Sequence, residues 1–181
     1  MKIIFLDRDG VINKDRSDYV KSVSEFEFLP GARESLRELT KAGYKIVVIS
    51  NQQAVGKGII SKETLEEIDL LLKEEVAKSG GRIDATYYCP HLKDENCDCR
   101  KPATGLLERA SRDFDVRLEE TIFVGDTVTD IEAGKRAGCQ TIALLTGKLS
   151  PIIIKSLPVK PDRVAQDLKE AVEMILGRKP K

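Results

Sequence analysis

Short apolar runs alternate with helical patterns along the chain, and this alternation predicts its fold. The apolar runs have the length and the β-branched composition of buried strands. They predict strands at Lys2–Leu6, Tyr44–Ile49, Ala85–Tyr88, Thr121–Val124 and Gln140–Leu145. Between these runs, apolar residues at helical spacing predict helices at Gly31–Ala42, Ser61–Lys78, Thr104–Phe114 and Thr129–Ala137. Near the end, a short strand at Asp162–Val164 is expected before an amphipathic helix.

Strands that alternate with helices form a parallel sheet with helices on both faces. We therefore expect a three-layer α/β fold of the Rossmann-like type. The chain fits a single domain over residues 1–181, because domains usually hold ~100–200 residues and no repeat or low-complexity linker interrupts it. Ser150–Pro161 is expected to be the loosest stretch. Ligands of such sheets bind at the carboxyl ends of the strands, so the residues after each strand are the first site candidates.

The charge balance limits the partners of the protein. The sequence has 30 Lys and Arg residues and 30 Asp and Glu residues, so its formal net charge is zero. A globally basic nucleic-acid surface is therefore not expected. No apolar run approaches the ~20 residues of a membrane helix, and the opening MKIIFLDRDG lacks the features of a secretory signal. We expect a cytoplasmic monomer that binds neither nucleic acid nor a membrane.

Two aspartates follow the first predicted strand. Strand alternation places Asp7 and Asp9 on the same side of the chain, and Gly10 lets the backbone turn away. Carboxylates this close repel each other unless a cation lies between them, and such oxygen ligands suit Mg²⁺. One carboxylate could attack phosphorus while the other acts as general acid and base. Taken alone, the D-x-D triplet is equally compatible with a solvated strand end.

Polar groups also follow the later strands. Ser50 and Asn51 follow the second strand, and Lys101 lies in CRKP beyond the third. Asp126 and Asp130 lie in GDTVTD, directly after the fourth strand. Phosphoryl transfer requires hydrogen-bond donors and a cation around the phosphate. Each strand thus supplies a polar group to one edge of the predicted sheet, where such a site would form.

The motifs DRDG, Ser50-Asn51, Lys101 and GDTVTD, in this order, resemble the four motifs of the haloacid dehalogenase (HAD) superfamily of phosphatases. The resemblance covers nearly the whole chain. It implies that Asp7 is the nucleophile and a Mg²⁺ ligand. It also implies that Asp9 is the general acid and base and gives its backbone carbonyl to the metal.

The same resemblance assigns roles to the later motifs. Ser50 and Lys101 would hold the oxygens of the transferring phosphoryl group, and Asp126 would be a further metal ligand. Asp130 would orient the site without contacting the metal. The interval between the nucleophile and Asn51 is too short for a large cap domain, so an open site without such a cap is expected.

The segment CPHLKDENCDCRKP contains a second candidate metal site. Its candidate ligands are Cys89, His91, Cys97 and Cys99. Two ligand pairs joined by a five-residue loop can enclose one tetrahedral Zn²⁺, and four protein ligands make such a site structural. The small zinc loop over residues 89–99 would then hold the segment that carries Lys101. The alternative is a set of free or redox-active thiols, which a reducing compartment makes less favourable.

This cysteine and histidine pattern is similar to that of the zinc-bearing HAD branch. The branch includes phosphatases of D-glycero-D-manno-heptose 1,7-bisphosphate and of histidinol phosphate. DRDGVINKD and NQQAVGKG look like the heptose enzymes, although Ala54 and Lys57 depart from their pattern. Arg100 would recognise substrate, because its planar fork suits a second phosphate or a pair of sugar hydroxyls. The substrate site implied by the resemblance consists of Asp15, Arg16, Ser17, Asp18, Ser50, Asn51, Gln52, Gln53, Arg100 and Lys101.

We therefore expect a Mg²⁺-dependent phosphatase with a structural Zn²⁺. It would remove the 7-phosphate of heptose 1,7-bisphosphate through an aspartyl-phosphate, and this small phosphorylated substrate is the partner expected. One alternative is a histidinol-phosphate phosphatase. Alternatives of another type are a nucleic-acid 3′-phosphatase and a non-catalytic zinc module.

Overall fold

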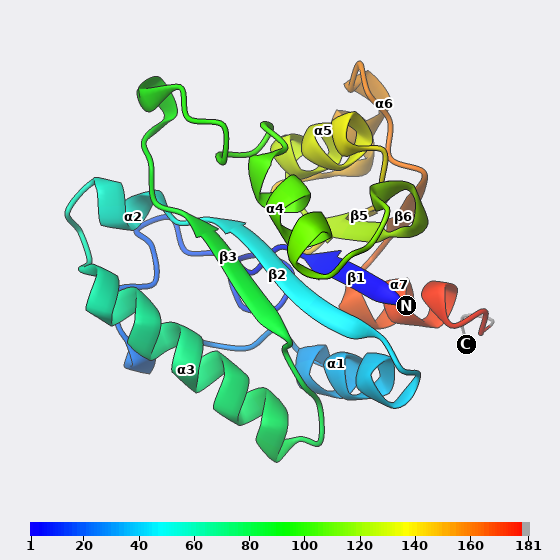
Figure 1. Ribbon diagram of the computed structural model, residues 1–181, viewed down its shortest axis with the longest axis horizontal. Helices are drawn as coiled ribbons and strands as arrows, with labels where there is room; N and C mark the ends of the chain where they lie inside the picture. The colour runs from blue at the N-terminus through cyan, green and yellow to red at the C-terminus, as the bar shows by residue number, and fades with distance from the viewer. Residues whose placement is uncertain (179–181) are drawn as a thin grey trace.

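A six-stranded parallel sheet forms the centre of the protein (Figure 1). The computed structural model describes residues 1–178. The strand order is β3-β2-β1-β4-β5-β6, so the first strand along the chain lies in the middle, between β2 and β4. The strands are β1 (Ile3–Leu6), β2 (Lys45–Asn51), β3 (Ala85–Cys89), β4 (Ile122–Gly125), β5 (Gln140–Leu144) and β6 (Arg163–Ala165).

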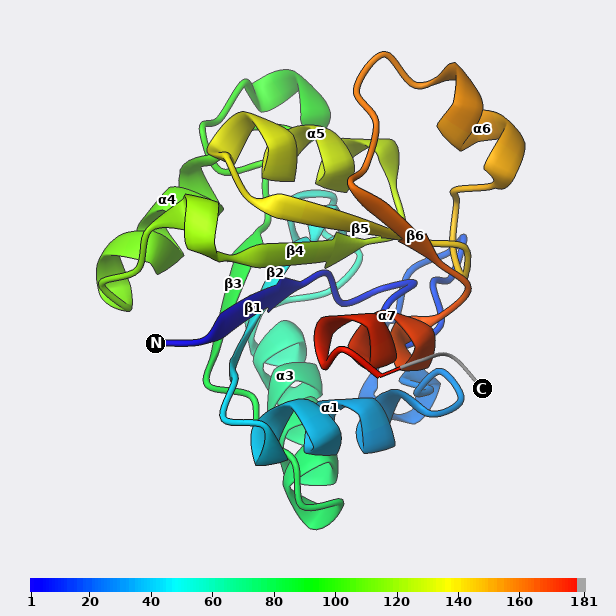
Figure 2. The same ribbon diagram turned by 90° about the vertical axis from the view of Figure 1, so that its right-hand side faces the viewer.

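Helices cover both faces of this sheet (Figure 2). The helices of one face are α1 (Ala32–Lys41), α3 (Lys62–Lys78) and α7 (Leu168–Ile175). The helices of the other face are α4 (Gly105–Asp113) and α5 (Val128–Ala137). The predicted three-layer α/β fold is therefore confirmed.

The central strand β1 explains why both faces need helices. All four of its residues are buried. Ile4 and Leu6 belong to the core beneath α1 and α7, while Ile3 and Phe5 belong to the core beneath α4 and α5. Burying a large apolar side chain stabilises the fold by about 1.5–3 kcal/mol. Because β1 is apolar on both sides, its first polar side chain comes where the strand ends, at Asp7.

Side-chain caps begin α3 and α5. Ser61 accepts a hydrogen bond from the Thr64 amide at 3.1 Å and so begins α3, as its sequence position predicts. Thr127 begins α5, where it accepts a bond from the Asp130 amide at 3.3 Å. This capping arrangement places Asp130 in the first turn of α5, directly beyond the end of β4.

Three elements differ from the sequence-based expectations. Strand β2 continues through Ser50 and Asn51, because its pairing with β3 extends to Cys89. The stretch expected to be loosest contains α6 (Pro151–Ser156), which begins with a serine cap and a proline in its first turn. A single helical turn, α2 (Gln53–Gly56), follows β2 where no helix was predicted.

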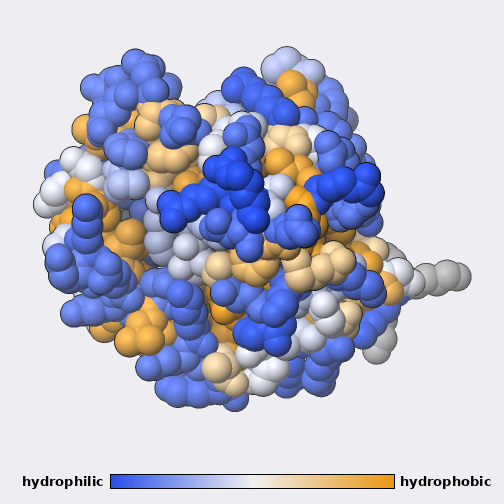
Figure 3. Space-filling view, in the orientation of Figure 1, coloured by the Kyte–Doolittle hydropathy of each residue, from blue (hydrophilic) through white to orange (hydrophobic). Residues whose placement is uncertain are grey.

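No cap domain separates β1 from α1 in the part of the chain that the structure describes. The connection is a loop with one short 3-10 helix at Val23–Glu25. Within residues 1–178, no helix has both the length and the apolar character required to cross a membrane. On the face drawn in Figure 3, hydrophilic side chains cover most of the surface, and apolar residues form small separate patches.

Candidate active site

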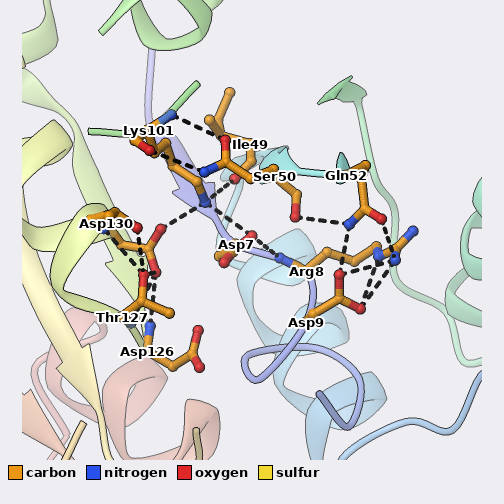
Figure 4. A network of polar contacts seen from close by, with 12 residues as sticks. Asp7, Arg8, Asp9, Ile49, Ser50, Gln52, Lys101, Asp126, Thr127 and Asp130 are labelled. Atoms are coloured by element: carbon orange, nitrogen blue, oxygen red, sulfur yellow. Dashed lines mark hydrogen bonds and ion pairs between the residues drawn. The ribbon is translucent and has the colours of Figure 1, made fainter. Parts of the chain in front are cut away.

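Asp7 lies at the carboxyl end of β1, at the centre of a buried polar network (Figure 4). The Arg8 amide donates a hydrogen bond to Asp7 Oδ1 at 2.7 Å, and Lys101 Nζ lies 3.0 Å from the same oxygen. Burial raises the pKa of Asp7 to about 6, although the charge of Lys101 and a hydrogen bond from Ser50 oppose the shift. The contacts with Arg8 and Lys101 thus hold the Asp7 carboxylate in one orientation.

Lys101 is a buried cation that links β2, the residue after β1 and the first turn of α5. Its ammonium lies 2.7 Å from Asp130 Oδ1 and donates a hydrogen bond to the Ile49 carbonyl at 2.8 Å. Burial alone would lower the pKa of Lys101, but the charges of Asp130 and Asp7 outweigh it and raise that pKa to about 12. Lys101 therefore remains charged at any physiological pH, ready to pair with phosphoryl oxygens.

Asn51 holds the backbone of Lys101 in place. Its side-chain amide donates to the Lys101 carbonyl at 3.1 Å, and its side-chain oxygen accepts from the Lys101 amide at 3.0 Å. These paired bonds fasten the loop after β3 to the last residue of β2. The position of the ammonium is therefore set by β2 as well as by its own loop.

Asp126 lies at the end of β4 with a carboxylate that has no hydrogen-bond donor. The residue is fully buried, and neither of its side-chain oxygens has a hydrogen-bond partner among the described residues. Burial, followed by the charges of Asp7 and Asp130, raises the pKa of Asp126 to about 8. A buried carboxylate without donors costs free energy unless a cation binds it. The arrangement therefore fits a metal ion.

Two glycines make room for this carboxylate. A Cβ atom on Gly10 would lie 2.2 Å from Asp126 Oδ2, and a Cβ atom on Gly147 would lie 1.7 Å from it. Gly10 also has a φ of 85°, a left-handed conformation that favours glycine. Both loops can approach Asp126 this closely only because they lack a side chain at these positions.

Asp130 orients the loop that carries Asp126. Its Oδ2 accepts hydrogen bonds from the amides of Asp126 and Thr127, at 3.2 and 3.0 Å, and from the Thr127 hydroxyl at 2.7 Å. Its Oδ1 faces Lys101. Asp7, Asp126 and Asp130 each offer an oxygen within 4.8 Å of the others. Both oxygens of Asp130 face donors, whereas the oxygens of Asp126 have none among the described residues, so Asp126 is better suited than Asp130 as a metal ligand.

Asp9 points away from this centre. Its carboxylate lies toward Arg8 and Gln52, whereas Asp7 points toward Lys101 (Figure 4). It accepts hydrogen bonds from Arg8 Nη2 at 3.0 Å, Asn13 Nδ2 at 2.8 Å and Gln52 Nε2 at 2.6 Å. These contacts outweigh the effect of burial and lower the pKa of Asp9. Its role as general acid and base remains a prediction, and it requires the side chain to leave these partners.

A cavity of 560 Å³ opens above Asp7, between the loops that follow the strands. Most of the predicted substrate-binding residues line it, namely Asp15, Arg16, Ser17, Ser50, Asn51, Gln52, Gln53, Arg100 and Lys101. Asp18 is the exception, because it lies on the surface and pairs with Arg16 and Lys21. The hydrogen bond from Lys21 is the main reason why the pKa of Asp18 falls to about 2. The prediction that Asp18 lines the substrate site is therefore not supported.

Sequence reasoning missed several residues of this cavity. Arg8, Tyr19, Thr127, Thr129 and Lys148 also line it. Arg8 is only 1% exposed, and it donates a hydrogen bond to Gln52 Oε1 at 2.9 Å. This bond fixes the side-chain amide of Gln52, which contacts Asp9. Arg8 could have been identified from the sequence, because it lies between Asp7 and Asp9 of the first motif. Lys148 follows β5, so the rule that ligands bind beyond strand ends could have identified it.

The four predicted zinc ligands form one cluster. Cys99 Sγ lies 3.1 Å from both Cys89 Sγ and His91 Nδ1, and 3.5 Å from Cys97 Sγ. One ligand atom from each residue lies within 4.8 Å of the others. Zinc–sulfur bonds of about 2.3 Å in a tetrahedron separate the sulfur atoms by about 3.8 Å. The cluster is therefore close to the dimensions that a bound Zn²⁺ requires.

Comparison with known proteins gives the family. A family model described as HAD-hydrolase-like matches residues 98–171. The D-glycero-beta-D-manno-heptose-1,7-bisphosphate 7-phosphatase of Pseudomonas putida is 39% identical over 158 residues, which cover 87% of this chain and 90% of that enzyme. The D-glycero-D-manno-heptose-1,7-bisphosphate 7-phosphatase of Chlorobaculum tepidum is 37% identical, and the match covers 98% of this chain and 96% of that enzyme. This chain belongs to the same family of HAD-like phosphatases.

A solved structure has the same fold as this HAD-like phosphatase. The D,D-heptose 1,7-bisphosphate phosphatase from B. bronchiseptica, crystallised with magnesium and phosphate, is 36% identical and superposes with a TM-score of 0.93. The match covers 98% of this chain and 99% of that one. The arrangement of strand ends described above is thus built on a phosphatase fold.

The charges of the site agree with a phosphatase that uses a metal ion. Asp7, Asp126 and Asp130 are buried together, and Lys101 is the cation that faces two of them. Three carboxylates against one ammonium leave an excess of negative charge when all are ionised. Such an excess would repel a phosphate dianion. A bound divalent cation would cancel this excess and remove the repulsion, so that the site could hold a phosphate.

Proposed function

We propose that this protein removes the 7-phosphate of D-glycero-D-manno-heptose 1,7-bisphosphate through an aspartyl-phosphate on Asp7. The observation that carries the reaction type is the convergence of Asp7 and Asp126, which follow β1 and β4, with Lys101 from the loop after β3. The substrate is supported by the relatives, whose names specify heptose 1,7-bisphosphate. The 560 Å³ cavity has room for a sugar bisphosphate beside Asp7.

Asp7 would act as the nucleophile. One of its carboxylate oxygens forms a bond to phosphorus while the bond between phosphorus and the sugar oxygen breaks. Lys101 and Ser50 donate hydrogen bonds to the phosphoryl oxygens and stabilise the charge of the transition state. Water then attacks the aspartyl-phosphate, which releases inorganic phosphate and restores the Asp7 carboxylate.

Asp9 would supply and remove the protons. It donates a proton to the departing sugar oxygen and later accepts one from the attacking water. In the described conformation Asp9 is held by Arg8 and Gln52 as an anion. A turn of its side chain toward the cavity would separate it from Arg8 and raise its pKa, because burial would no longer be offset by that cation.

Mg²⁺ is the proposed metal of this site. Asp7, Asp126 and the backbone carbonyl of Asp9 would hold it, since the oxygens of Asp126 have no other partner. When bound, the ion neutralises charge on the phosphoryl group and aligns it with the nucleophile. Asp130 would keep Asp126 in place through its bonds to the loop amides.

Arg100 and the loop of Asp15–Ser17 would contact the sugar bisphosphate beyond the reacting phosphate. Arg100 donates to the His91 carbonyl at 3.2 Å and to Gln53 Oε1 at 3.1 Å. Both partners are neutral, so its charge is available to a substrate.

The relatives include enzymes named for the beta anomer, in Pseudomonas putida, and for the alpha anomer, in Campylobacter jejuni. We therefore include both anomers in the test of substrate.

Substrate comparison tests the proposed function. We expect kcat/KM with Mg²⁺ to be much higher for one or both anomers of heptose 1,7-bisphosphate than for histidinol phosphate. Phosphate release is measured for all three compounds under the same conditions. A preference for histidinol phosphate would keep the reaction type but overturn the substrate. Activity on nucleic-acid 3′-phosphates with a steep salt dependence would overturn the small-molecule assignment.

A structural Zn²⁺ in the cysteine and histidine cluster is the second proposed metal. Cys99 lies two residues before Lys101, and Arg100 between them bonds to the carbonyl of the ligand His91. The metal would thereby hold both substrate-contacting side chains of this loop. Four protein ligands leave no coordination position for water, so the ion would take no part in the chemistry.

Removal of zinc should weaken substrate binding. We expect KM to rise by about tenfold or more, because loss of a well-ordered charged contact costs ~1.5–3 kcal/mol. The measurement is steady-state kinetics with excess Mg²⁺, on protein whose loss of zinc is verified by metal analysis. Cys97→Ser should reproduce the effect, and Cys139→Ser, which removes a buried thiol outside the cluster, should leave KM unchanged. Unchanged kinetics in verified zinc-free protein would contradict the proposed role.

A further inference from the structure

Lys148 is a cation of the active-site cavity that the mechanism above does not use. It follows β5 and lines the same cavity as Asp7 and Arg100. Its ammonium lies 2.8 Å from Asp15 Oδ2, and 70% of its side chain is exposed. An ion pair this exposed is worth only ~0–1 kcal/mol. Lys148 can therefore exchange Asp15 for another anion at little cost.

The backbone on either side of Lys148 is anchored to the catalytic loops. The Thr146 hydroxyl donates a hydrogen bond to the Gly10 carbonyl at 2.6 Å. The Leu149 amide donates to the Asp126 carbonyl at 3.0 Å, and the Leu149 side chain is buried. The chain is thus fixed against the metal site while the Lys148 side chain extends into the open part of the cavity.

Most other cations that line the cavity are already paired with carboxylates. Arg8 pairs with Asp9, Arg16 with Asp18 and Glu25, and Lys101 with Asp7 and Asp130. Among the described residues that line the cavity, Arg100 bonds only to neutral groups, and Lys148 has only its exposed pair with Asp15. They follow β3 and β5, which lie on opposite sides of β1 in the sheet. Asp7, at the end of β1, therefore lies between two available positive charges.

The exposure of Lys148 indicates which part of a substrate it would meet. The phosphoryl group that is transferred must lie in the buried network of Asp7, Ser50 and Lys101, where Lys101 and the proposed metal supply positive charge. The remainder of the substrate extends toward the mouth of the cavity. A sugar bisphosphate carries a second dianion there, and an exposed ammonium is a suitable partner for it.

We propose that Lys148 binds the phosphate group that is not hydrolysed, by exchanging its ion pair with Asp15 for that phosphate. This inference rests on the proposed bisphosphate substrate. The exchange also releases the Asp15 carboxylate, which can then accept hydrogen bonds from sugar hydroxyls. The hydrogen bond to Asp15, together with the charges of Asp15, Asp126 and Asp7, raises the pKa of Lys148. Its ammonium is therefore charged at neutral pH.

The test compares a bisphosphate with the matching monophosphate. We expect Lys148→Met to lower kcat/KM for heptose 1,7-bisphosphate about 10- to 100-fold, the effect of one charged hydrogen bond. The same variant should change kcat/KM for heptose 7-phosphate by less than about threefold, because an exposed ion pair contributes little. Lys148→Arg should retain most of the bisphosphate activity. A purely structural role would affect both substrates alike.

Two controls separate direct binding from side effects. Lys148→Met leaves the Asp15 charge unpaired in the cavity, so Asp15→Asn combined with Lys148→Met removes that charge as well. The bisphosphate-specific loss should persist in this double variant. Lys135→Met breaks a lysine–aspartate pair of 2.7 Å with Asp162 outside the cavity. It should leave kcat/KM unchanged for both substrates. Equal losses for the two substrates, no loss, or full recovery in the double variant would each overturn the proposal.

A second measurement tests Lys148 even if heptose 1,7-bisphosphate is not turned over by the wild-type protein, which would contradict the proposed function alone. Hydrolysis of p-nitrophenyl phosphate is followed with fructose 1,6-bisphosphate or fructose 6-phosphate as inhibitor. The bisphosphate should inhibit the wild type more strongly, and Lys148→Met should remove that difference. Equal inhibition of the wild type by both sugars, or an unchanged difference in the variant, would overturn the role of Lys148.

Discussion

Asp7→Asn should reduce phosphate release by about 10⁴-fold or more, because it removes the proposed nucleophile and no other group can form the same intermediate. The variant should fold, since asparagine has the same size and Lys101 keeps its contact with Asp130. Lys101, Ser50 and Asp126 also remain, so substrate should still bind in the presence of Mg²⁺. The measurements are steady-state phosphate release and calorimetric binding of heptose 1,7-bisphosphate.

The control for this variant is Asp113→Asn, which changes an exposed aspartate on α4 outside the cavity. Its activity should equal that of the wild type. If Asp7→Asn retained more than a small fraction of the activity with normal binding, Asp7 would not be the nucleophile. A loss of binding together with a loss of activity would indicate a misfolded site, which the thermal transition of the variant would reveal.

Asp126→Asn should strongly reduce metal-dependent activity and yet stabilise the metal-free protein. A metal ion that neutralises transition-state charge is worth several kcal/mol, so we expect a loss of about 10³-fold in kcat/KM. Without metal, the wild type must bury the Asp126 carboxylate with no donor near it. The neutral amide avoids that penalty but leaves its own polar atoms unpaired. We expect a net gain of about 1–3 kcal/mol in the free energy of unfolding at pH 8.

The stability of the metal-free protein should depend on pH, because two buried carboxyl groups have raised pKa values. Burial raises the pKa of Asp126 from 3.8 to about 8 and that of Asp7 from 3.8 to about 6. Between pH 3.8 and about pH 8, the folded protein keeps protons on these carboxyl groups that the unfolded chain has lost. The stability of the metal-free wild type should therefore fall as the pH rises from about 4 to about 8. Asp126→Asn should remove most of this slope, and Mg²⁺ should reduce it in the wild type.

Asp84→Asn is the matched control, because Asp84 is a partly buried aspartate with the opposite shift. Despite its burial, bonds from the Ile46 amide, Lys45 and Arg82 lower its pKa. Its stabilising effect is therefore present above pH 3.8 and is lost as the pH falls through its folded pKa. Asp84→Asn should destabilise the protein at pH 8 and leave kcat/KM unchanged. A metal-free Asp126→Asn no more stable than the wild type, with an unaltered pH profile, would contradict the account of Asp126.

That the motif residues meet at one edge of the sheet could be predicted from the sequence, because each motif is local. Asp7, Ser50 and Asp126 lie at or next to the ends of strands that read as short apolar runs, and a parallel sheet brings those ends to one edge. The zinc cluster could be found for a similar reason, since its ligands lie within eleven consecutive residues, 89–99. Neither inference required the packing of distant loops.

The remaining features depend on contacts between residues far apart in the chain. The orientation of Asp9 is set partly by Gln52, 43 residues later. Lys148 reaches the site because Thr146 bonds to Gly10, 136 residues earlier. Asp18 is a local exception, because its carboxylate pairs with the loop neighbours Arg16 and Lys21 and lies outside the cavity. Hydrophobic periodicity carries no information on any of these side-chain partners.

Chemical trapping of the intermediate tests the central claim most directly. The protein is mixed with heptose 1,7-bisphosphate and Mg²⁺, quenched during turnover and reduced with borohydride, which converts an aspartyl-phosphate to homoserine. Asp7→Asn is treated in parallel. We predict homoserine at position 7 in peptide mass spectra of the wild type and none in Asp7→Asn. Reduction at another carboxylate, or an unmodified Asp7 during sustained turnover of the wild type, would contradict the account.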